Sequence, residues 1–274
     1  MKRFFVIANI EKAFASETAI KIRNYLSACS GVSCNVWLGG KSDDYPIPED
    51  TECIITIGGD GTLIQAVRAA KGRNIKFIGI NRGHLGYLTG LSGDEEIEPA
   101  LKRLLEDDYG VEDRMMLKSH AYRNGKLIYE DIAINEVLVV KKDPLHIVRF
   151  DISVGGTFIG SFNGDGVIVS TPTGSSAYSL SAGGPIADPN SRLIILTPIC
   201  SHSSNARSII FGPNDRITVT ARSDIQLLSC DSDTVAEIQS GDEIVIEESE
   251  YRTRFIKLKN ESFMDVLREK MKLM

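Results

Sequence analysis

Apolar runs alternate with helical patterns along the first hundred residues. The apolar runs are 3–10, 32–39, 52–58 and 75–81, and the segments with helical spacing are 15–30, 63–72 and 95–108. Strands that alternate with helices in this way form a parallel sheet that is covered by helices. We therefore expect an α/β domain with a Rossmann-like parallel sheet over residues 1–98.

The pattern changes from about Val111 to short runs in which apolar and polar residues alternate with period two. These runs are 114–123, 126–140, 147–162, 165–172, 192–199, 216–222, 225–231, 242–248 and 252–259, separated by the turn dipeptides NG, GG and GP. Such a series predicts a second, all-β domain of the β-sandwich type over residues 99–249. One segment, 174–184, has a helical pattern. The last residues, 250–274, include an amphipathic segment that we expect to return to the α/β domain.

The most informative segment follows the strand predicted at 52–58, where the chain reads Gly58-Gly59-Asp60-Gly61-Thr62. Glycines let the backbone turn sharply and bring N–H groups close to an anion, and Thr62 is placed to cap the next helix. Ligands of parallel sheets lie at the carboxyl ends of the strands, where this loop falls. The sequence predicts a phosphate site that contains a carboxylate. An ordinary strand-to-helix turn with Asp60 as helix N-cap fits the local pattern equally well.

Two further polar clusters interrupt apolar strand patterns. Thr171-Pro172-Thr173-Gly174 ends a strand and is followed by hydroxyl residues, which suits a polar ligand but also ordinary helix capping. Asn135 and Glu136 lie side by side within the predicted strand 126–140. A carboxamide beside a carboxylate suits a base edge and a ribose hydroxyl, while an exposed strand face or a bulge explains the pair equally well.

Composition narrows the possible partners. Lys and Arg number 31 and Asp and Glu 37, a net charge of −6 without a long basic run, so nucleic acid is not expected as a partner. No apolar stretch approaches the ~20 residues of a membrane span, so we expect no membrane association and a cytoplasmic protein. The five cysteines form no CxxC pair and suggest neither a disulfide framework nor a zinc site. Cys53 and Cys200 lie in apolar runs and are expected in the core.

Taken together, these motifs resemble the NAD kinase family. The motifs that carry the resemblance, in the family's order and approximate spacing, are GGDGT followed by LIQAV, NRGHLGYLT, the Asn135-Glu136 pair, GDGVIVSTPTGSSAYSLSAGGP and TPICSHSSNARS. The match covers most of the chain. Lipid kinases and phosphofructokinases carry loops similar to GGDGT, but TPTGSSAYSLSAGG together with the asparagine-glutamate pair is highly specific.

The resemblance implies transfer of the γ-phosphoryl group of ATP, or of polyphosphate, to the 2′-hydroxyl of the adenosine ribose of NAD, with a divalent cation, Mg²⁺, that no protein residue is assigned to bind. It implies Asp60 as the general base. The residues that it assigns to the donor phosphates are Gly58, Gly59, Gly61, Thr62 and Arg82. The residues that it assigns to NAD are Asp60, Gly61, Tyr87, Asn135, Glu136, Asp165, Thr173, Ser176, Ala177, Tyr178 and Ser181.

The resemblance also implies a homo-oligomer, a dimer or a tetramer, and a site between the two domains. One departure concerns Asp233, which stands where glutamine is common in the family and adds a carboxylate to that segment. Two alternatives remain open at the level of sequence. One is a lipid or small-polyol kinase of the same superfamily, which should present an apolar acceptor cleft. The other is a non-catalytic NAD-binding sensor, against which an intact Asp60 argues.

Overall fold

A computed structural model of the chain describes residues 1–40, 45–81, 87–91, 93–203, 205–223, 225–232, 234–259 and 262–271. The chain forms two compact units, Met1–Asp113 with Thr253–Met274, and Arg114–Arg252. The first unit is α/β and the second is built of antiparallel strands, as the sequence pattern predicts. The boundary predicted at residue 98 falls within helix α3 (Ile97–Leu105) of the first unit.

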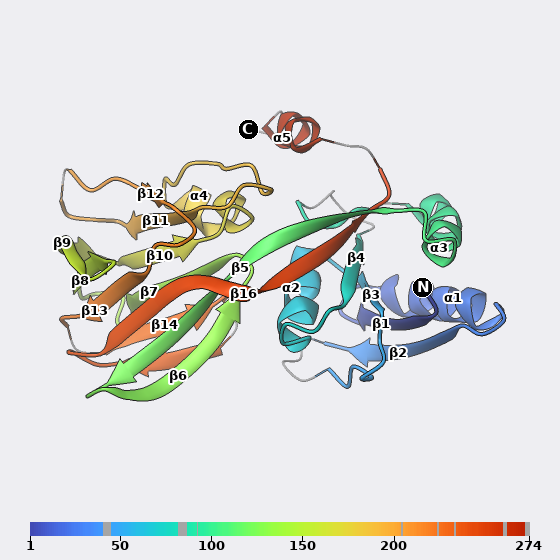
Figure 1. The fold of residues 1–274 in the computed structure, drawn as a ribbon, viewed down its shortest axis with the longest axis horizontal. Helices are drawn as coiled ribbons and strands as arrows, with labels where there is room; N and C mark the ends of the chain where they lie inside the picture. The colour runs from blue at the N-terminus through green and yellow to red at the C-terminus, as the bar shows by residue number, and fades with distance from the viewer. Residues whose placement is uncertain are drawn as a thin grey trace. The chain divides into compact units, whose positions relative to one another are not determined.

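The first unit is built on a parallel sheet (Figure 1). Its strands are β1 (Arg3–Asn9), β2 (Ser33–Gly39), β3 (Cys53–Ile57), β4 (Lys76–Ile80) and the end of β16 (Glu243–Lys257), in the order β2-β1-β3-β4-β16. Helices α1 (Ala15–Ser27) and α3, which follows the short 3₁₀ helix η1 (Asp94–Glu96), pack apolar side chains onto one core with β1, β3 and β4. Helix α2 (Asp60–Ala69) packs against β3 and β4 and starts at the glycine loop.

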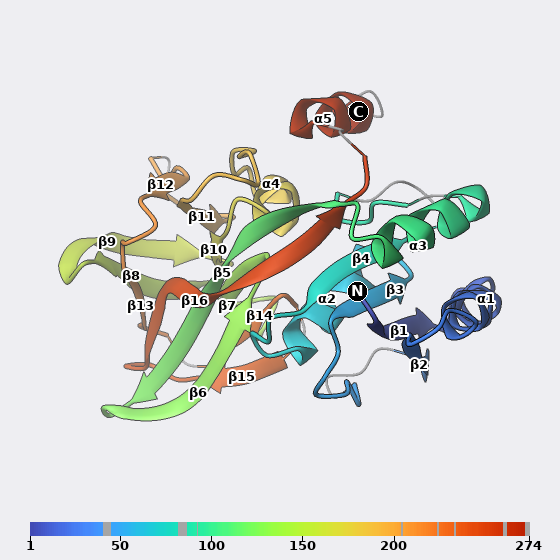
Figure 2. The same ribbon diagram turned by 45° about the vertical axis from the view of Figure 1, so that its right-hand side comes forward.

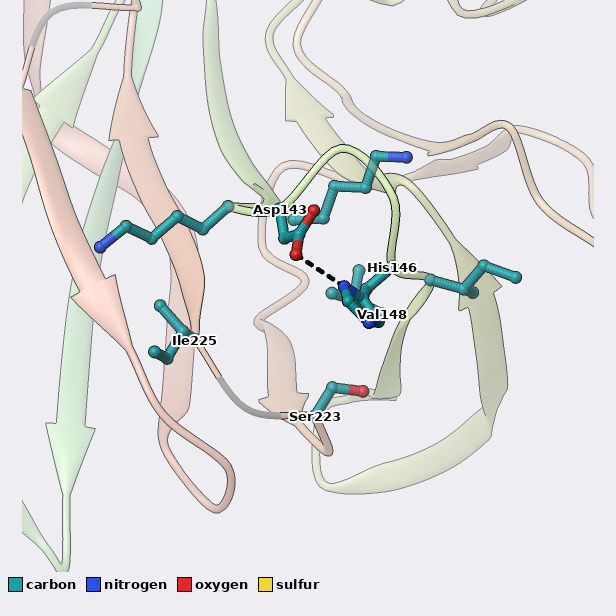
Figure 3. Close-up of a pocket in the computed structure, with 8 residues that line it drawn as sticks. Asp143, His146, Val148, Ser223 and Ile225 are labelled. Atoms are coloured by element: carbon teal, nitrogen blue, oxygen red, sulfur yellow. Dashed lines mark hydrogen bonds and ion pairs between the residues drawn. The ribbon is translucent and has the colours of Figure 1, made fainter.

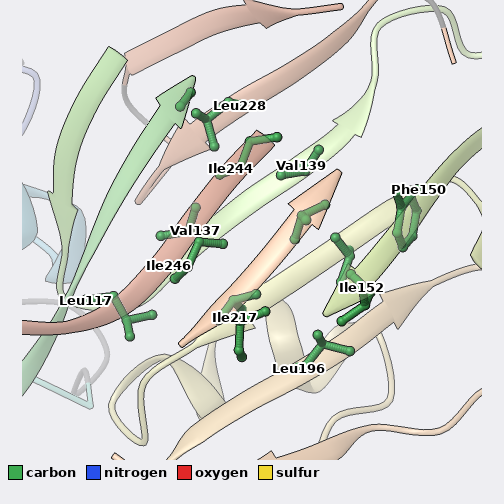
Figure 4. Close-up of a cluster of buried hydrophobic side chains, with 14 of the residues drawn as sticks. Leu117, Val137, Val139, Phe150, Ile152, Leu196, Ile217, Leu228, Ile244 and Ile246 are labelled. Carbon is green, nitrogen blue, oxygen red and sulfur yellow. The ribbon is translucent and has the colours of Figure 1, made fainter. Parts of the chain in front are cut away.

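The second unit contains two antiparallel sheets that enclose one apolar core (Figure 4). One comprises β5 (Gly110–Arg123), β6 (Lys126–Ala133), β8 (Val148–Val154), β9 (Thr157–Gly164), β13 (Ile217–Ala221) and β16. The other has the order β12-β11-β10-β7-β14-β15, with β7 (Glu136–Lys141), β10 (Gly166–Ser170), β11 (Ile194–Ile199), β12 (Ile209–Phe211), β14 (Gln226–Cys230) and β15 (Thr234–Ile238). Core residues come from both sheets, which gives the β-sandwich-like arrangement that the sequence predicts.

Two turn dipeptides form tight hairpins at the predicted positions. Asn124-Gly125 joins β5 to β6 with φ angles of 50° and 74°, and Gly155-Gly156 joins β8 to β9 with φ angles of 56° and 82°. Positive φ at both central residues is the geometry of a type I′ turn, which glycine and asparagine adopt at low cost. Figures 1 and 2 both show β5 and β6 side by side as a long hairpin.

Three predicted elements differ in the structure. The strand predicted over 126–140 is broken at Ile134 and Asn135, so that β6 and β7 belong to different sheets. The helix predicted over 174–184 forms only a 3₁₀ turn, η2 (Gly174–Ser176), and the single turn α4 (Tyr178–Ser181), because Ala177 leaves the helical region with φ −96° and ψ −130°. The strands predicted at 242–248 and 252–259 form the continuous β16.

The amphipathic segment near the C-terminus forms helix α5 (Phe263–Met271). Its described side chains are half-buried or exposed, so the expected docking of this helix stays a prediction. Within the described parts of the chain, no helix has both the length and the apolar character to cross a membrane.

Candidate active site

The glycine loop and Asp60 lie at the carboxyl end of β3, a strand whose five residues are all buried. Gly58 N–H donates to the carbonyl of Ile80 at 2.9 Å, which joins the loop to the end of the neighbouring strand β4. Gly59 is the N-cap of α2, with an extended backbone, and Asp60 is the first helical residue. The sequence therefore placed the carboxylate correctly at a strand end, but it is not the helix N-cap.

Glycine is required at only one of the three glycine positions of the loop. A Cβ on Gly58 would lie 2.4 Å from the hydroxyl oxygen of Thr62, so packing requires glycine there. A Cβ on Gly59 or Gly61 would meet no atom within 4 Å, and neither residue has a positive φ. Neither packing nor backbone conformation demands these two glycines, which leaves an open backbone that a ligand can approach closely.

Thr62 does not have the capping role that the sequence suggested. Its side chain is buried against Gly58, and α2 has no hydrogen bond from a capping side chain. The residue fixes the shape of the glycine loop from inside. A helix that begins at Asp60 needs its cap earlier in the chain, and the extended Gly59 takes that position.

The Asp60 carboxylate is held by the segment that follows β4. Its Oδ2 accepts the backbone N–H of Tyr87 at 2.9 Å, and its Oδ1 accepts those of Thr89 at 3.2 Å and Leu88 at 3.4 Å. Tyr87 thus lies at the predicted site, with its backbone on the carboxylate. Arg82, which was assigned to the donor phosphates, lies outside the described residues, as do the rest of 82–86.

A second carboxylate, that of Asp231, organises the Asn135-Glu136 pair. Asp231 Oδ1 accepts the backbone N–H groups of Asn135 at 2.8 Å and Glu136 at 3.1 Å, and Oδ2 accepts that of Ile134 at 2.8 Å. Asp231 has a left-handed φ of 52°. Because these N–H groups point to a carboxylate, they cannot continue a strand ladder, which explains why the predicted strand breaks here.

The TPTG turn packs onto the same break. Thr171 N–H donates to the carbonyl of Asn135 at 2.9 Å, and the Thr171 hydroxyl donates to that of Ile134 at 2.6 Å while it accepts Gly174 N–H at 3.0 Å. A Cβ on Gly174 would lie 2.1 Å from the Asn135 carbonyl oxygen, so only glycine fits. The two motifs that are far apart in sequence therefore form one rigid structure.

Glu136 is a buried carboxyl group beside Asp231. Its side chain is 4% exposed, and Oε2 has no hydrogen-bond partner within the described residues. Burial, with a smaller contribution from the Asp231 charge, raises the pKa of Glu136 to about 8. A buried carboxyl group with an unused oxygen can bind a polar ligand group, because the desolvation of that oxygen has already taken place.

The remaining predicted NAD-binding residues of the turn differ in how far they are exposed to solvent. Thr173 is buried, and its hydroxyl accepts Nη1–H of the buried Arg114 at 3.5 Å. Ser176 and Ala177 are half-buried, while Ser181 is exposed and the Tyr178 side chain is 40% exposed. Helix α4 has only four residues and no side-chain cap, and the polar-ligand site that the sequence suggested at this turn stays a prediction.

Asp165 links β9 to β10 and is paired with Lys141, a residue that the sequence analysis did not single out. The Lys141 ammonium lies 2.6 Å from Asp165 Oδ1. The hydrogen bond from Lys141 is the main cause that lowers the pKa of Asp165, and Cys200 also contributes. Cys200 was expected in the core but is exposed, with a left-handed φ of 46°, because β11 ends at Ile199.

Sequence reasoning missed the structural roles of Asp231, Arg114 and Lys141. The Asp231-Ser232 pair follows directly after an apolar strand, and both residues have a positive φ, 52° and 62°. An aspartate at a strand end is a signal for a side chain that accepts backbone N–H groups. Arg114 and Lys141 lie in strand patterns that give no such signal, since a strand lysine or arginine is usually a solvated one. Asp233, whose effect the sequence left open, is outside the described residues.

Comparison with known proteins places this geometry in a family. Residues 44–109 match the model of the ATP-NAD kinase N-terminal domain, and residues 134–258 match that of the ATP-NAD kinase C-terminal domain. The chain is 40% identical over 295 residues to the NAD kinase of Lachnospira eligens. The alignment covers 99% of this chain and 100% of that protein. The chain belongs to the NAD kinase family. It is therefore a kinase that acts on NAD, and the recognition made from the motifs is confirmed.

Other relatives of the chain are also NAD or NADH kinases. The NAD kinase of Agathobacter rectalis is 36% identical over 283 residues, with 99% of both chains covered. The crystal structure of an Archaeoglobus fulgidus NAD kinase in complex with ATP aligns with a TM-score of 0.78 at 25% identity and covers 100% of each chain. Yeast NADH kinase complexed with NADH aligns with a TM-score of 0.89 at 22% identity, over 99% of this chain and 88% of that one, and supports the fold.

Proposed function

We propose that this NAD kinase transfers the γ-phosphoryl group of ATP to the 2′-hydroxyl of the adenosine ribose of NAD. The new bond joins the 2′-oxygen to the γ-phosphorus, and the bond from that phosphorus to the β–γ bridging oxygen breaks, so the products are ADP and NADP. The observation that carries the proposal is Asp60, a carboxylate oriented by backbone N–H groups in a loop whose glycines leave the backbone open.

Asp60 is proposed as the general base that takes the proton of the 2′-hydroxyl. Its carboxylate is oriented before substrate binds, because Tyr87, Leu88 and Thr89 donate to both of its oxygens. Gly58, Gly59 and Gly61 would approach the donor phosphates with their backbone, Thr62 would maintain the loop, and Arg82 would offset phosphate charge. Alignment and charge neutralisation are most of what phosphoryl transfer requires from a protein.

Several of the proposed NAD-binding residues belong to the structure that Asp231 and the TPTG turn form in the second unit. Asn135 and Glu136 would accept and donate hydrogen bonds at the adenosine, and Thr173 and Tyr178 would contact it. Further contacts come from Gly61, Tyr87, Ser176, Ala177 and Ser181, with Asp165 toward the nicotinamide ribose. Support comes from the unused Oε2 of Glu136 and from the half-exposed ring of Tyr178.

A divalent cation, Mg²⁺ in the first place, is proposed as a cofactor that neutralises the phosphates. Within the described residues no group of three or more His, Cys, Asp or Glu side chains could hold a metal ion. The cation would reach the site with ATP, since Mg²⁺ commonly binds substrate phosphates together with only one or two carboxylates.

The decisive experiment incubates the purified chain with NAD, ATP and MgCl₂ and measures NADP. NADP that forms only with the cation present supports the proposal, and replacing ATP by polyphosphate identifies the donor. Binding of NAD without any NADP would favour a non-catalytic sensor, and phosphorylation of a lipid or polyol in place of NAD would favour the other kinase class.

Acceptor analogues test where NAD is held. NAD with hypoxanthine in place of adenine should react at least tenfold more slowly, whereas 3-acetylpyridine and other nicotinamide-ring variants should be tolerated. The reason is that loss of a hydrogen-bonded group leaves buried partners such as Glu136 unmatched. The opposite ranking would contradict the assignment of the adenosine pocket.

We also propose that the enzyme is a cytoplasmic homo-oligomer, a dimer or a tetramer. The second unit carries large exposed apolar side chains, among them Leu145 and Phe158, that a partner subunit would cover. Light scattering after size-exclusion chromatography gives the mass, and a monomer at micromolar concentration would contradict the proposal.

A further inference from the structure

Two of the sequence motifs meet at a row of three hydroxyl groups in the second unit. Ser179 belongs to GDGVIVSTPTGSSAYSLSAGGP, whereas Thr197 and Ser208 are the first and last residues of TPICSHSSNARS. The hydroxyl oxygen of Thr197 lies 3.2 Å from that of Ser179 and 3.0 Å from that of Ser208. Since a hydroxyl group can donate one hydrogen bond and accept others, Thr197 can bind both serines at once. None of the three residues has a role in the proposed function.

Ser179 attaches helix α4 to β11. Of the four residues of α4, all of which the structure describes, only Ser179 is buried. The helix has no side-chain cap, and among the described residues no other side-chain hydrogen bond joins it to the sheet. Figures 1 and 2 both show α4 beside β11. A single helical turn gains little stability from its own backbone hydrogen bonds, so the conformation of α4 depends on this contact.

Gly184 packs directly over the hydroxyl groups of Ser179 and Thr197. Its N–H donates to the carbonyl of Ser179 at 2.8 Å. A Cβ on Gly184 would lie 2.4 Å from the hydroxyl oxygen of Ser179 and 2.8 Å from that of Thr197, so only glycine fits. Both hydroxyl residues are buried, Ser179 completely and Thr197 to 1% exposure. Because a buried hydroxyl without a partner costs free energy, removal of one hydroxyl would leave the other unsatisfied.

The neighbours of Ser179 in α4 are residues that the proposed function assigns to NAD. Tyr178 precedes it and is 40% exposed, and Ser181, two positions later, is exposed as well. The turn therefore buries one hydroxyl and presents to solvent the side chains that would contact NAD. A turn that is already held in place need not be ordered when NAD binds, and this raises the affinity.

We propose that Thr197 is a positioning residue for NAD. Its hydroxyl, which Ser208 holds in turn, fixes α4 against β11 before the substrate binds. Tyr178 and Ser181 are thereby in place for the adenosine, so TPICSHSSNARS supports the substrate site through α4. The effect on NAD affinity rests on the proposed function, whereas the effect on the conformation of α4 does not.

Hydrogen–deuterium exchange of the full chain without ligand tests the attachment of α4. Thr197→Val keeps the shape of the side chain and removes its hydroxyl. The amides of 182–184, which donate to carbonyls of α4, should then exchange at least threefold faster than in wild type. Thr197→Ser retains the hydroxyl and should restore the slow exchange. Equal exchange in wild type and Thr197→Val would overturn the proposal.

Calorimetry and steady-state kinetics test the effect on substrate. Thr197→Val should raise the Kd and the Michaelis constant for NAD roughly three- to tenfold, because NAD must then order the turn. The kcat and the Michaelis constant for ATP should be unchanged, and Thr197→Ser should bind NAD like wild type. A lower kcat with unchanged NAD affinity would overturn the proposal, since loss of positioning acts on binding.

A double variant tests whether Ser179 and Thr197 act as a pair. Ser179→Ala and Thr197→Val each leave one buried hydroxyl unsatisfied, whereas the two changes together leave none. The double variant should therefore bind NAD no more weakly than the weaker of the two single variants. Multiplied effects would overturn the pairing. If Thr197→Val does not fold, Ser179→Ala carries the same predictions for exchange and for NAD affinity.

Two control variants match the loss of a hydroxyl and the loss of a hydrogen bond. Thr253→Val removes a buried hydroxyl on β16 that has no hydrogen-bond partner among the described residues. His146→Ala breaks the exposed hydrogen bond to Asp143, 2.7 Å long, in the connection from β7 to β8 (Figure 3). Effects of either control as large as those of Thr197→Val would overturn the proposal. Absence of NADP synthesis by wild type would overturn the proposed function instead, and the exchange result would not depend on it.

Discussion

The carboxylate of Asp231 holds the backbone of Asn135, with 2.8 Å between Oδ1 and the amide nitrogen. The same carboxylate accepts the N–H groups on either side, of Ile134 and Glu136. One side chain thus satisfies three consecutive backbone donors that no strand partner reaches. The position of the proposed adenosine-binding pair depends on a residue that the site assignment did not include.

Removal of this carboxylate should affect both stability and NAD binding. We expect Asp231→Ala to lower the free energy of unfolding by roughly 2–4 kcal/mol, because hydrogen bonds to charged groups contribute about 1.5–3 kcal/mol each and Asp231 is partly solvated. The Michaelis constant for NAD should rise at least tenfold. Urea unfolding and steady-state kinetics measure the two effects.

The control for that variant is Asp215→Ala. Asp215 also accepts a backbone N–H, that of Gly212 at 2.8 Å, but in an exposed turn. The Asp215→Ala substitution should lower the free energy of unfolding by less than about 1 kcal/mol and leave kcat and the Michaelis constants unchanged. If both variants behave alike, Asp231 has no special role in the site.

Asp60→Asn should lose most of its turnover while NAD still binds. Asparagine retains one acceptor oxygen, which can still take the N–H of Thr89, but its NH2 group replaces the oxygen that accepts the N–H of Tyr87, and it cannot take a proton from the 2′-hydroxyl. A general base contributes about 10²–10⁴-fold, so kcat should fall within that range. Asp60→Ala, which loses the acceptor as well, should in addition raise the Michaelis constants. A kcat near that of wild type across the pH range would exclude the base role.

Asn135→Ala and Tyr178→Ala should raise the Michaelis constant for NAD several-fold and leave that for ATP unchanged. Both side chains are proposed to hold the acceptor, and Tyr178 is 40% exposed without substrate. Tyr251→Ala is a matched control, since Tyr251 is 39% exposed on β16. An effect confined to ATP would mean that the two substrates have been assigned to each other's pockets.

The buried Glu136 predicts a pH-dependent stability. Its folded-state pKa is raised from 4.5 to about 8, so the folded state holds a proton that the unfolded chain releases from about pH 4.5 upward. The stability associated with the protonated group is complete below pH 4.5 and is lost progressively as the pH rises to about 8.

Glu136→Gln removes that proton equilibrium and keeps the shape. The melting temperature of the variant relative to wild type should therefore increase between pH 5 and 8 and level off above pH 8. Glu98→Gln, at an exposed position of α3, should show a constant difference over the same range. A constant difference for both variants would mean that Glu136 is ionised in the folded protein.

The sequence predicted those features that local patterns determine. The alternation of strands and helices gave the parallel sheet, and period-two runs with NG and GG turns gave the sandwich, because each pattern is complete within about ten residues. The glycine loop was correctly placed at a strand end for the same reason. The motifs were sufficient to recognise the family, although the roles of single residues remain proposals.

Features that depend on distant residues were not predicted. The break at Ile134 and Asn135 is caused by Asp231, which is 95 residues from Glu136 along the chain. The apolar pattern of the sequence continues through the break, so the pattern predicts a single strand. The ion pair of Lys141 and Asp165 likewise joins two strand ends, and the burial of Thr62 depends on the absence of a side chain at Gly58. Only the folded backbone brings these pairs together.

The long strand β16 determines which of the two units can be completed first during synthesis. Arg254 and Phe255 pair with Lys76 and Phe77 of β4, so the parallel sheet of the first unit lacks one strand until these two residues have left the ribosome. The second unit, Arg114–Arg252, is continuous and is complete before then. A message truncated just before residue 253 would therefore encode all of the second unit and leave the edge of β4 open to pairing with other chains.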